Sequence, residues 1–457
     1  MERQLYALTS SQNVLYYSQK FTLHKQINNI PMLILLEEDL DMDLFTTSLL
    51  KGYERMDSLR IRLTKDGEEI KQYFMDSESP EIHHLDMENK SEEEIDKIFR
   101  KLAAKRVTYF DKPLSRAYLL KNCYGKSGLF FVISHMIIDS WGICVFFKDI
   151  IAIYEALKKG EDLPKAPYPY KPILEQELNY RNTPQYLKDR AFWEKEFPSH
   201  SEPIFTGING REALEKTRKK LKNPNFRSVK AFSLRTKGDH FIDLFSKDLV
   251  DRMTAFSVAN KIPLQALIML SFRTYLSRVN NKEKDIFYYT VLARRGTLAE
   301  KNCGGSKVYF LPFRTNIGED TTFMEALNII AEKQSSVYRH SAINPLEVLN
   351  IIRTTYNIEL GFVYSTGSLT FQPIPLKGVN GTKLHTKWYP NGGASNRFYL
   401  TIMDDDGSGA LRFYYEHQIT HIKKEWLQKL HRYMEKVIEK GINDKDITIK
   451  ELLDIEI

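Results

Sequence analysis

The sequence predicts an α/β (α+β) fold built as two lobes. The chain has 457 residues, more than one hydrophobic core usually fills, so two domains or subdomains are expected. Strand-like and helix-like patterns are mixed in both halves, which is typical of α/β and α+β architectures. The proline-rich stretch "EDLPKAPYPYKP" interrupts these patterns and places a boundary near residues 165–200. We therefore expect an N-terminal lobe at 1–175 and a C-terminal lobe at 176–457.

The N-terminal half begins with a strand, a helix and a hairpin. "PMLILLEE" (31–38) is a run of β-formers, and "DMDLFTTSLLKGYERM" (41–56) has apolar residues at helical spacing with Asp41 as the candidate N-cap. The segment after it alternates and turns at Asp66-Gly67, as a hairpin does. "SEEEIDKIFRKLAAKRV" (91–107) opens with a Ser-x-x-Glu capping box and continues as a helix.

In the stretch "FFVISHMIIDSWG" (130–142) a predicted strand is followed by a predicted helix. Two strands surround a turn at 124–128, and the second ends just before His135. After Asp139 the apolar residues lie on one helical face, and Lys158–Gly160 end the helix. Histidine is the side chain whose ordinary pKa suits proton transfer at neutral pH, so His135 is the main candidate for chemistry.

The C-terminal half continues the mixture of helices and strands. Three long apolar-periodic segments predict helices, and the last of them closes the chain. The helices are expected near 246–259, 262–279 and 422–440, and the strands at 285–292, 308–316, 357–364, 397–403 and 410–416.

Composition excludes several classes of protein. The net charge of +7 comes from interleaved Lys, Arg, Asp and Glu without a basic block, so no nucleic-acid partner is expected. Three cysteines without a CxxC spacing favour neither a disulfide framework nor a zinc site, and the histidines show no metal-ligand spacing. The N-terminus lacks a signal-peptide h-region, and the apolar runs are shorter than a membrane span. We expect a cytoplasmic protein, a monomer, with no metal and no membrane span.

Several segments, taken in order, resemble one acyltransferase family. "SHMIIDSWG" is similar to the His-His-x-x-x-Asp-Gly core of the condensation domains of nonribosomal peptide synthesis, which belong to the chloramphenicol-acetyltransferase-like acyltransferases. His-x-x-x-Asp alone is a weak signal, and the specificity comes from the accompanying segments, which cover nearly the whole chain. These segments are "LTSSQNVLYY" (8–17), "ERMDSLRIRL" (54–63), "FDKPLSRAYLL" (110–120), "TVLARRGTLAEKNCGGSKVYFLPFRTNI" (290–317), "YRHSAINPLEVL" (338–349) and the closing "WYPNGGASNRFYLTIMDDDGSGALRFYYEHQ".

The resemblance implies a fold and a set of site residues. The fold is two chloramphenicol-acetyltransferase-like lobes in a V-shaped pseudo-dimer with a central tunnel. His135 is implied as the catalytic residue. Asp139 is implied as structural support, paired with an arginine of the other lobe. By residue order that arginine matches Arg294, with Arg295 as the close alternative.

Two departures from the family pattern lie beside His135. Ser134 replaces the first histidine of the pair, which many related acyltransferases also lack. Ser140 and Gly142 have exchanged the positions of the small residues after Asp139. Ser134, Ser140 and Trp141 are therefore candidates for lining the tunnel or the substrate, although a strand-end hydrogen bond for Ser134 and simple packing for Trp141 are the plainer interpretations.

The leading functional hypothesis is amide formation. The resemblance implies transfer of an acyl or aminoacyl group from a phosphopantetheine thioester, on a carrier protein in trans or on CoA, to an amine acceptor, with no permanently bound cofactor. One alternative is a non-catalytic module that binds a carrier protein or another partner. A further alternative is an ester-forming O-acyltransferase, although the Asp-Phe-Gly-Trp-Gly motif of the plant enzymes is absent.

Overall fold

The structure is a computed structural model that describes residues 3–77, 80–231, 234, 236–372, 383–404 and 407–456. By internal contacts the chain divides into two compact units, and each is described here by itself. The first unit comprises Met1–Thr183, Ala293–Tyr309 and Pro375–Gly393, and the second comprises Pro184–Leu292, Phe310–Ile374 and Ala394–Ile457.

Two later segments of the chain belong to the first unit. The predicted lobes, 1–175 and 176–457, leave the segments 293–309 and 375–393 in the C-terminal lobe, whereas by internal contacts they belong to the first unit. Patterns of local hydrophobicity show where an element begins and ends, but not which later segment returns to pack against it. The division into lobes at 1–175 and 176–457 stays a prediction.

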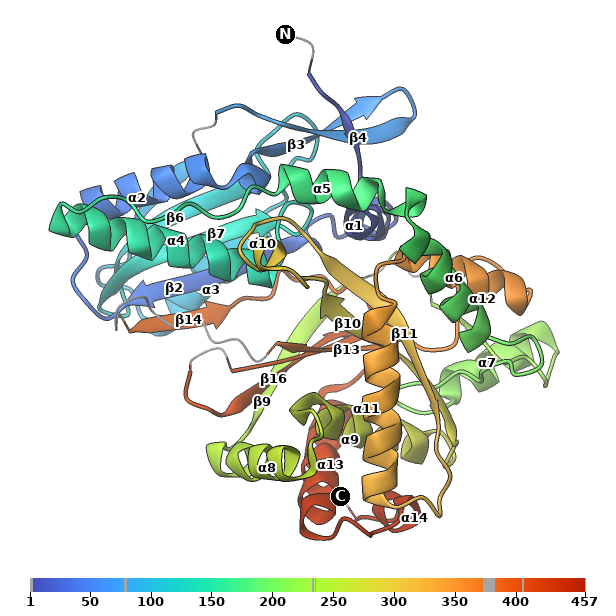
Figure 1. Cartoon of the computed structure of the whole chain (residues 1–457). Coiled ribbons are helices and arrows are strands. Elements are labelled where there is room, and N and C mark those ends of the chain that lie inside the picture. The colour runs from blue at the N-terminus through green and yellow to red at the C-terminus, as the bar shows by residue number, and fades with distance from the viewer. Residues whose placement is uncertain are drawn as a thin grey trace. The chain divides into compact units, whose positions relative to one another are not determined.

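A five-stranded sheet lies at the centre of the first unit (Figure 1). Both of its faces are apolar, since successive residues of β2 (Asn29–Leu36), such as Ile34 and Leu35, belong to two separate buried clusters. The helices α2 (Met42–Arg55) and α4 (Ser140–Lys159) supply one cluster, and α3 (Glu92–Ala103) supplies the other. In spatial order the strands are β14 (Leu384–Trp388), β2 (Asn29–Leu36), β7 (Lys126–Ser134), β6 (Ser115–Cys123) and β5 (Ile82–Asp86).

The remaining elements of the first unit include the predicted hairpin. It turns at Gly67, whose positive φ of 59° favours glycine, and it forms a three-stranded sheet in the order β1-β4-β3. The predicted capping box on Ser91 is also present and starts α3. The elements are β1 (Tyr6–Ala7), α1 (Ser10–Lys20), the short helix η1 (Asp57–Arg60), β3 (Ile61–Asp66), β4 (Glu69–Phe74), α5 (Lys171–Leu178), η2 (Tyr180–Asn182) and α10 (Leu298–Lys301).

A six-stranded mixed sheet dominates the second unit (Figure 1). The central pairs β10–β13 and β13–β15 are parallel, whereas β15–β16 and β16–β9 are antiparallel. In spatial order the strands are β11 (Val308–Asn316), β10 (Asp285–Ala293), β13 (Gly367–Gln372), β15 (Phe398–Met403), β16 (Leu411–Gln418) and β9 (Gly238–Phe245).

Helices cover one face of this second sheet. Phe272 of α9 (Leu264–Val279) stacks on Phe398 of β15, and His431 of α13 (Lys424–Asn443) contacts Tyr415 of β16. The helices of the second unit are α6 (Pro184–Glu196), α7 (Glu212–Leu221), α8 (Lys247–Asn260), α9 (Leu264–Val279), α11 (Phe323–Arg339), α12 (Pro345–Thr355), α13 (Lys424–Asn443) and α14 (Ile449–Leu453), and β8 (Val229–Lys230) pairs with β12 (Phe362–Val363).

One predicted strand is largely wrong. The sequence predicts a strand over 357–364, but only Phe362–Val363 is extended and paired. Asn357 (φ 49°) and Gly361 (φ 91°) both take left-handed backbone conformations, so the chain turns twice within this stretch. The strand that enters the large sheet is β13, which begins three residues later, at Gly367.

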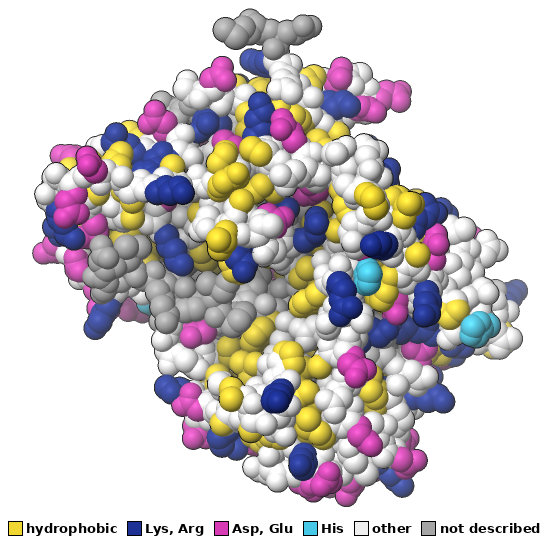
Figure 2. Space-filling model, viewed as in Figure 1, with side chains coloured by type: hydrophobic (Ala, Val, Ile, Leu, Met, Phe, Trp, Pro, Cys, Tyr) yellow, Lys and Arg dark blue, Asp and Glu magenta, His cyan; other side chains and the backbone are white. Residues whose placement is uncertain are grey.

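Charges of both signs share the visible surface, and one bent pair of helices is both long and apolar. On the visible face in Figure 2, the Lys and Arg side chains are interspersed with Asp and Glu. No single described helix is long and apolar enough to cross a membrane, and only the bent pair α8 and α9, with 109° between them, passes that length and composition test together.

Candidate active site

His135 follows directly after the last residue of β7. Ser134 is still paired with Asn29 of β2, and the backbone N of His135 donates to the carbonyl of Asn28 at 2.7 Å. A tight turn over 135–137 then leads towards α4. The sheet therefore fixes the backbone on which the half-buried His135 side chain is carried.

Asp139 is the N-cap of α4 and is completely buried. Its Oδ1 accepts a hydrogen bond from the backbone N of Gly142 at 2.8 Å and from Nη2 of Arg295 at 2.9 Å. Its Oδ2 accepts from the backbone N of Lys307 at 2.9 Å. A buried carboxylate needs such partners to offset its desolvation, so Asp139 is a structural clamp on the His135 loop.

The arginine that pairs with Asp139 is Arg295, not Arg294. The choice of Arg294 from residue order is therefore corrected to the alternative. Arg294 instead lies with its guanidinium 5.7 Å from the ring centre of Tyr180. Neighbouring residues in extended chain point to opposite sides, and residue order alone does not decide which one points inward.

The Arg295 guanidinium is buried among backbone carbonyls as well as beside Asp139. Both the arginine and the carboxylate belong to the first unit, because the segment 293–309 packs there. The pair thus forms within one unit, whereas the resemblance implied an arginine of the other lobe. Nη1 donates to the carbonyls of Glu300 (2.6 Å) and Cys303 (2.9 Å), and Nη2 donates to those of Gly304 (3.1 Å) and Gly305 (3.0 Å).

Two glycines let the returning segment approach the His135 loop. Gly305 has φ of 80°, and a Cβ there would lie 2.1 Å from the Tyr170 ring. A Cβ on Gly304 would lie 2.0 Å from the Ser58 hydroxyl. The carbonyl of Gly305 accepts from the backbone N of Asp139 at 3.1 Å. The "CGGSK" segment (303–307) is thus part of the candidate site's framework.

Ser306 is the residue that contacts the His135 ring. Its Oγ lies 3.3 Å from His135 Nδ1 and 3.0 Å from the Oγ of Ser11. Ser306 is fully buried and Ser11 is 1% exposed, so water does not compete for these hydrogen bonds. Sequence reasoning missed both serines, and no local pattern distinguishes them from other serines of the chain.

Burial lowers the pKa of His135 below its ordinary value. The negative charge of Asp139 and a hydrogen bond to the histidine's own backbone carbonyl oppose this shift without reversing it. The imidazole is therefore neutral at neutral pH, which is the form that accepts a proton.

A buried lysine anchors the returning segment from its other side. The Lys307 side chain is 1% exposed, and its Nζ lies 3.2 Å from Oε1 of Glu300 and 3.7 Å from Oε2 of Glu177. Glu177 also accepts from the hydroxyl of Tyr309 at 2.8 Å. Sequence reasoning missed this ion cluster as well, because its members are scattered along the chain.

The other predicted site residues lie close to the His135 loop with protein partners. The buried Ser134 Oγ lies 3.3 Å from the hydroxyl of Tyr109 and accepts from the backbone N of Met136 at 3.3 Å. Ser140 is half-buried as the first residue of α4, and Trp141 Nε1 donates to the carbonyl of Lys301 at 2.8 Å. A substrate-lining role for these three residues stays a prediction.

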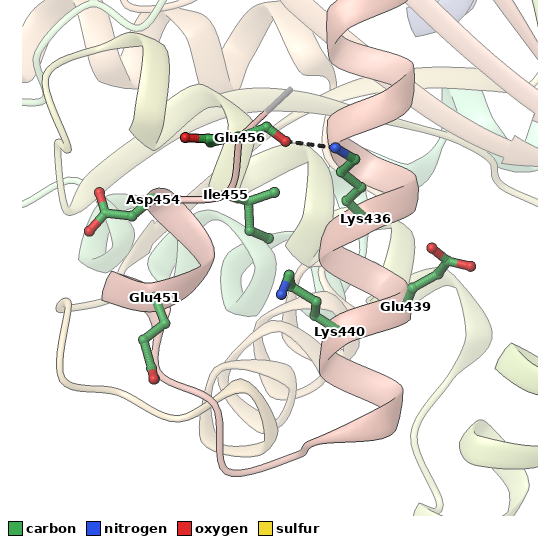
Figure 3. Close-up of a pocket in the computed structure, with 7 residues that line it drawn as sticks. All are labelled: Lys436, Glu439, Lys440, Glu451, Asp454, Ile455 and Glu456. Carbon is green, nitrogen blue, oxygen red and sulfur yellow. Dashed lines mark hydrogen bonds between the residues drawn. The ribbon is translucent and has the colours of Figure 1, made fainter.

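A pocket of about 420 Å³ lies elsewhere, in the second unit (Figure 3). Several of its charges already have protein partners: Lys436 donates to the carbonyl of Glu456 at 2.7 Å, and Asp454 pairs with Lys282 at 2.7 Å. These contacts hold the last residues of the chain against α13 and Lys282. Within the described residues, no three His, Cys, Asp or Glu side chains are grouped as a metal site would need.

Comparisons with known proteins point to one family. The condensation-domain family matches residues 2–453. The chain is 24% identical over 455 residues to one of the plipastatin synthase proteins of Bacillus subtilis (strain 168), and 23% identical over 463 residues to surfactin synthase subunit 1 of the same organism. Both matches cover 99% of this chain but only 17% and 12% of those relatives, so the chain spans a small part of their length.

Solved structures confirm the predicted fold class. The first condensation domain of the calcium-dependent antibiotic synthetase, in complex with a substrate analogue, matches with a TM-score of 0.79 at 17% identity, over 98% of this chain and 99% of that one. The starter condensation domain of rhizomide synthetase, in complex with C8-CoA, matches with a TM-score of 0.81 at 17% identity, over 99% and 98%. The chain belongs to the condensation-domain family, whose members are amide-forming acyltransferases of nonribosomal peptide synthesis.

Proposed function

We propose that this chain transfers an acyl or aminoacyl group from a phosphopantetheine thioester to an amine. The donor is presented by a separate carrier protein or by CoA, which carry the same reactive arm. The single observation that carries the proposal is the buried framework around His135: Ser306 contacts Nδ1, while Asp139 and Arg295 fix the loop. The C8-CoA complex of the rhizomide domain supports a thioester donor.

In the proposed reaction His135 moves the proton. The amine nitrogen attacks the thioester carbonyl carbon, a C–N bond forms, and Nε2 of His135 accepts the proton that the amine loses. The tetrahedral intermediate then collapses, the C–S bond breaks, and the proton passes from His135 to the leaving sulfur. Atoms and charge balance without a permanent cofactor.

The hydrogen bonds of the His135 ring favour one tautomer. A carbonyl oxygen only accepts hydrogen bonds, so the bond to the residue's own carbonyl requires a proton on the ring nitrogen that faces it. We assign that proton to Nδ1, with Ser306 as the second partner at 3.3 Å. Nε2 is then left with the lone pair that a general base needs.

The test is a single-turnover assay with a thioester-loaded carrier protein and a saturating amine, followed by intact mass. His135→Ala should lower the rate about 10²–10⁴-fold, the usual range for a lost acid–base group. Ser134→Ala, which changes the neighbouring buried side chain, is the matched control and should stay close to wild type. Folding should be nearly intact in both variants.

The possible outcomes separate the competing functions. An unchanged rate in His135→Ala would contradict the proposal and favour a module that only binds a carrier protein. Transfer to an alcohol but not to an amine would instead favour an ester-forming enzyme. Replacing the loaded carrier with acyl-CoA in a parallel assay distinguishes the two donors.

A further inference from the structure

A row of polar residues crosses five strands of the large sheet in the second unit. The strand register aligns them as direct neighbours from one strand to the next. Directly paired residues in a sheet point to the same face, so these five side chains share one face. From β10 to β9 the polar row consists of Tyr289, Ser368, Tyr399, Glu416 and His240.

The polar row points away from the helices that cover the other face. Phe398 and Tyr415, which precede Tyr399 and Glu416 by one residue each, contact α9 and α13. Because side chains alternate along a strand, the polar row belongs to the opposite side of the sheet. The next row on that side also contains hydroxyl groups, since Thr370 pairs with Thr401 and Thr401 with Tyr414.

Glu416 is the acidic member of this row and is half-buried. Burial raises the pKa of its carboxyl to about 7. Across the described part of the chain, no side chain forms an ion pair or hydrogen bond with this carboxylate. By contrast, Asp139 is bound by Arg295, and Asp285 by Arg314 at 2.6 Å. An acidic group removed from water is costly unless a cation pairs with it, so an ammonium bound beside Glu416 would lower that cost.

We propose that the polar row is a binding site for a small molecule that carries a protonated amine, and that Glu416 is the residue that recognises the ammonium group. An ammonium offers three hydrogen-bond donors and a positive charge, which match a carboxylate flanked by the hydroxyl of Tyr399. This binding is a property of the second unit alone and does not depend on the proposed function.

The test uses a charged probe and an uncharged probe of equal length. Binding of n-butylammonium chloride and of n-butanol is titrated by NMR at pH 8 with the whole chain, in wild type, Glu416→Gln and Glu435→Gln. Glu435 of α13 is the matched control, because it is also half-buried but does not belong to the polar row. No thioester is present, so the measurement is independent of transfer.

Glu416→Gln should weaken n-butylammonium binding about 10- to 100-fold, the range for a lost charge-assisted hydrogen bond, and should leave n-butanol binding unchanged. Glu435→Gln should bind both probes like wild type. Equal n-butylammonium binding in wild type and Glu416→Gln would overturn the proposal, and so would an equal loss in Glu435→Gln.

Two further measurements keep the proposal falsifiable. In wild type, the ¹³C signal of the Glu416 carboxyl should shift with n-butylammonium and not with n-butanol, and the absence of a shift would overturn the proposal even if Glu416→Gln fails to fold. His135→Ala should bind n-butylammonium as wild type does. Binding in His135→Ala tests the Glu416 site without the transfer reaction. A wrong Glu416 site and a wrong transfer reaction therefore give different results.

Discussion

The two large sheets of this molecule use their faces differently. In the first unit both faces are apolar and covered by helices, and the proposed chemistry lies at the end of a strand, on His135. In the second unit one face is apolar and the other carries the polar row. The comparison teaches that a sheet covered by helices on both faces serves as a scaffold, whereas the sheet with one polar face is where we propose binding.

The largest expected effect on stability concerns the buried ion pair of Asp139 and Arg295. Arg295→Ala and Asp139→Ala should each reduce the free energy of unfolding by about 3–5 kcal/mol, because each leaves a buried charge without its partner. The double variant should lose much less than the sum, as measured by denaturant unfolding in a double-mutant cycle.

Arg294→Ala is the matched control for that cycle. Its side chain contacts the Tyr180 ring and not Asp139, so its free energy of unfolding should stay within about 1 kcal/mol of wild type. Additive losses for Asp139→Ala and Arg295→Ala, or an effect of Arg294→Ala as large as theirs, would show that the clamp is not the pair described above.

The second prediction compares the two sheet faces directly. Leu33→Ala, in the completely buried face beneath α3, should cost about 2–5 kcal/mol of stability through lost apolar contacts and a cavity. Thr401→Ala, beside the polar row, should cost less than about 1 kcal/mol. Thermal and urea unfolding of both variants measure the contrast, and equal losses would mean that the polar side is packed like a core.

The third prediction follows from the raised pKa of Glu416. The folded chain keeps this proton up to about pH 7, while an unfolded glutamate loses it near its ordinary value of 4.5. The unfolded state therefore binds fewer protons in that window, and this group makes stability fall as pH rises from about 4.5 to 7.

Glu416→Gln should remove that loss. Relative to wild type, the variant should gain on the order of 1–2 kcal/mol in free energy of unfolding between pH 5 and pH 8. Glu359→Gln, at an exposed position of the same unit, should show no such gain. A pH-independent difference for Glu416→Gln would mean that its carboxyl is ionised normally in the folded state.

The smallest expected effect concerns Ser306. Removing its hydroxyl should leave the His135 tautomer less well defined and lower transfer about 3- to 10-fold, in line with one neutral hydrogen bond. The pH profile is the informative readout: because burial lowers the pKa of His135, the acidic limb of wild type should lie below pH 6.5, and it should move in Ser306→Ala. Ser306→Thr, which keeps the hydroxyl, should restore the pH profile. If the acidic limb does not move in Ser306→Ala, Ser306 has only a packing role.

Sequence reasoning located the site along the chain better than it located the site's partners. The strand that ends at Ser134 and the helix that begins after Asp139 are local patterns, and the structure confirms both of them. Arg295 was reached only as an alternative to Arg294, and Ser11 and Ser306 were missed. These partners depend on which side of a returning segment faces His135, and that is set by tertiary packing rather than by local propensity.

Strand β14 has a consequence for the order of events during synthesis. Residues 384–388 form the edge of the first unit's sheet beside β2, yet they leave the ribosome roughly 200 residues after Thr183. At about 5–20 residues per second this is a delay of roughly 10–40 s. During that time "NIPMLILL" of β2 is an open, apolar edge that can pair with a neighbouring nascent chain. Slow decoding between residues 184 and 383 would therefore increase aggregation without changing a single contact of the finished protein.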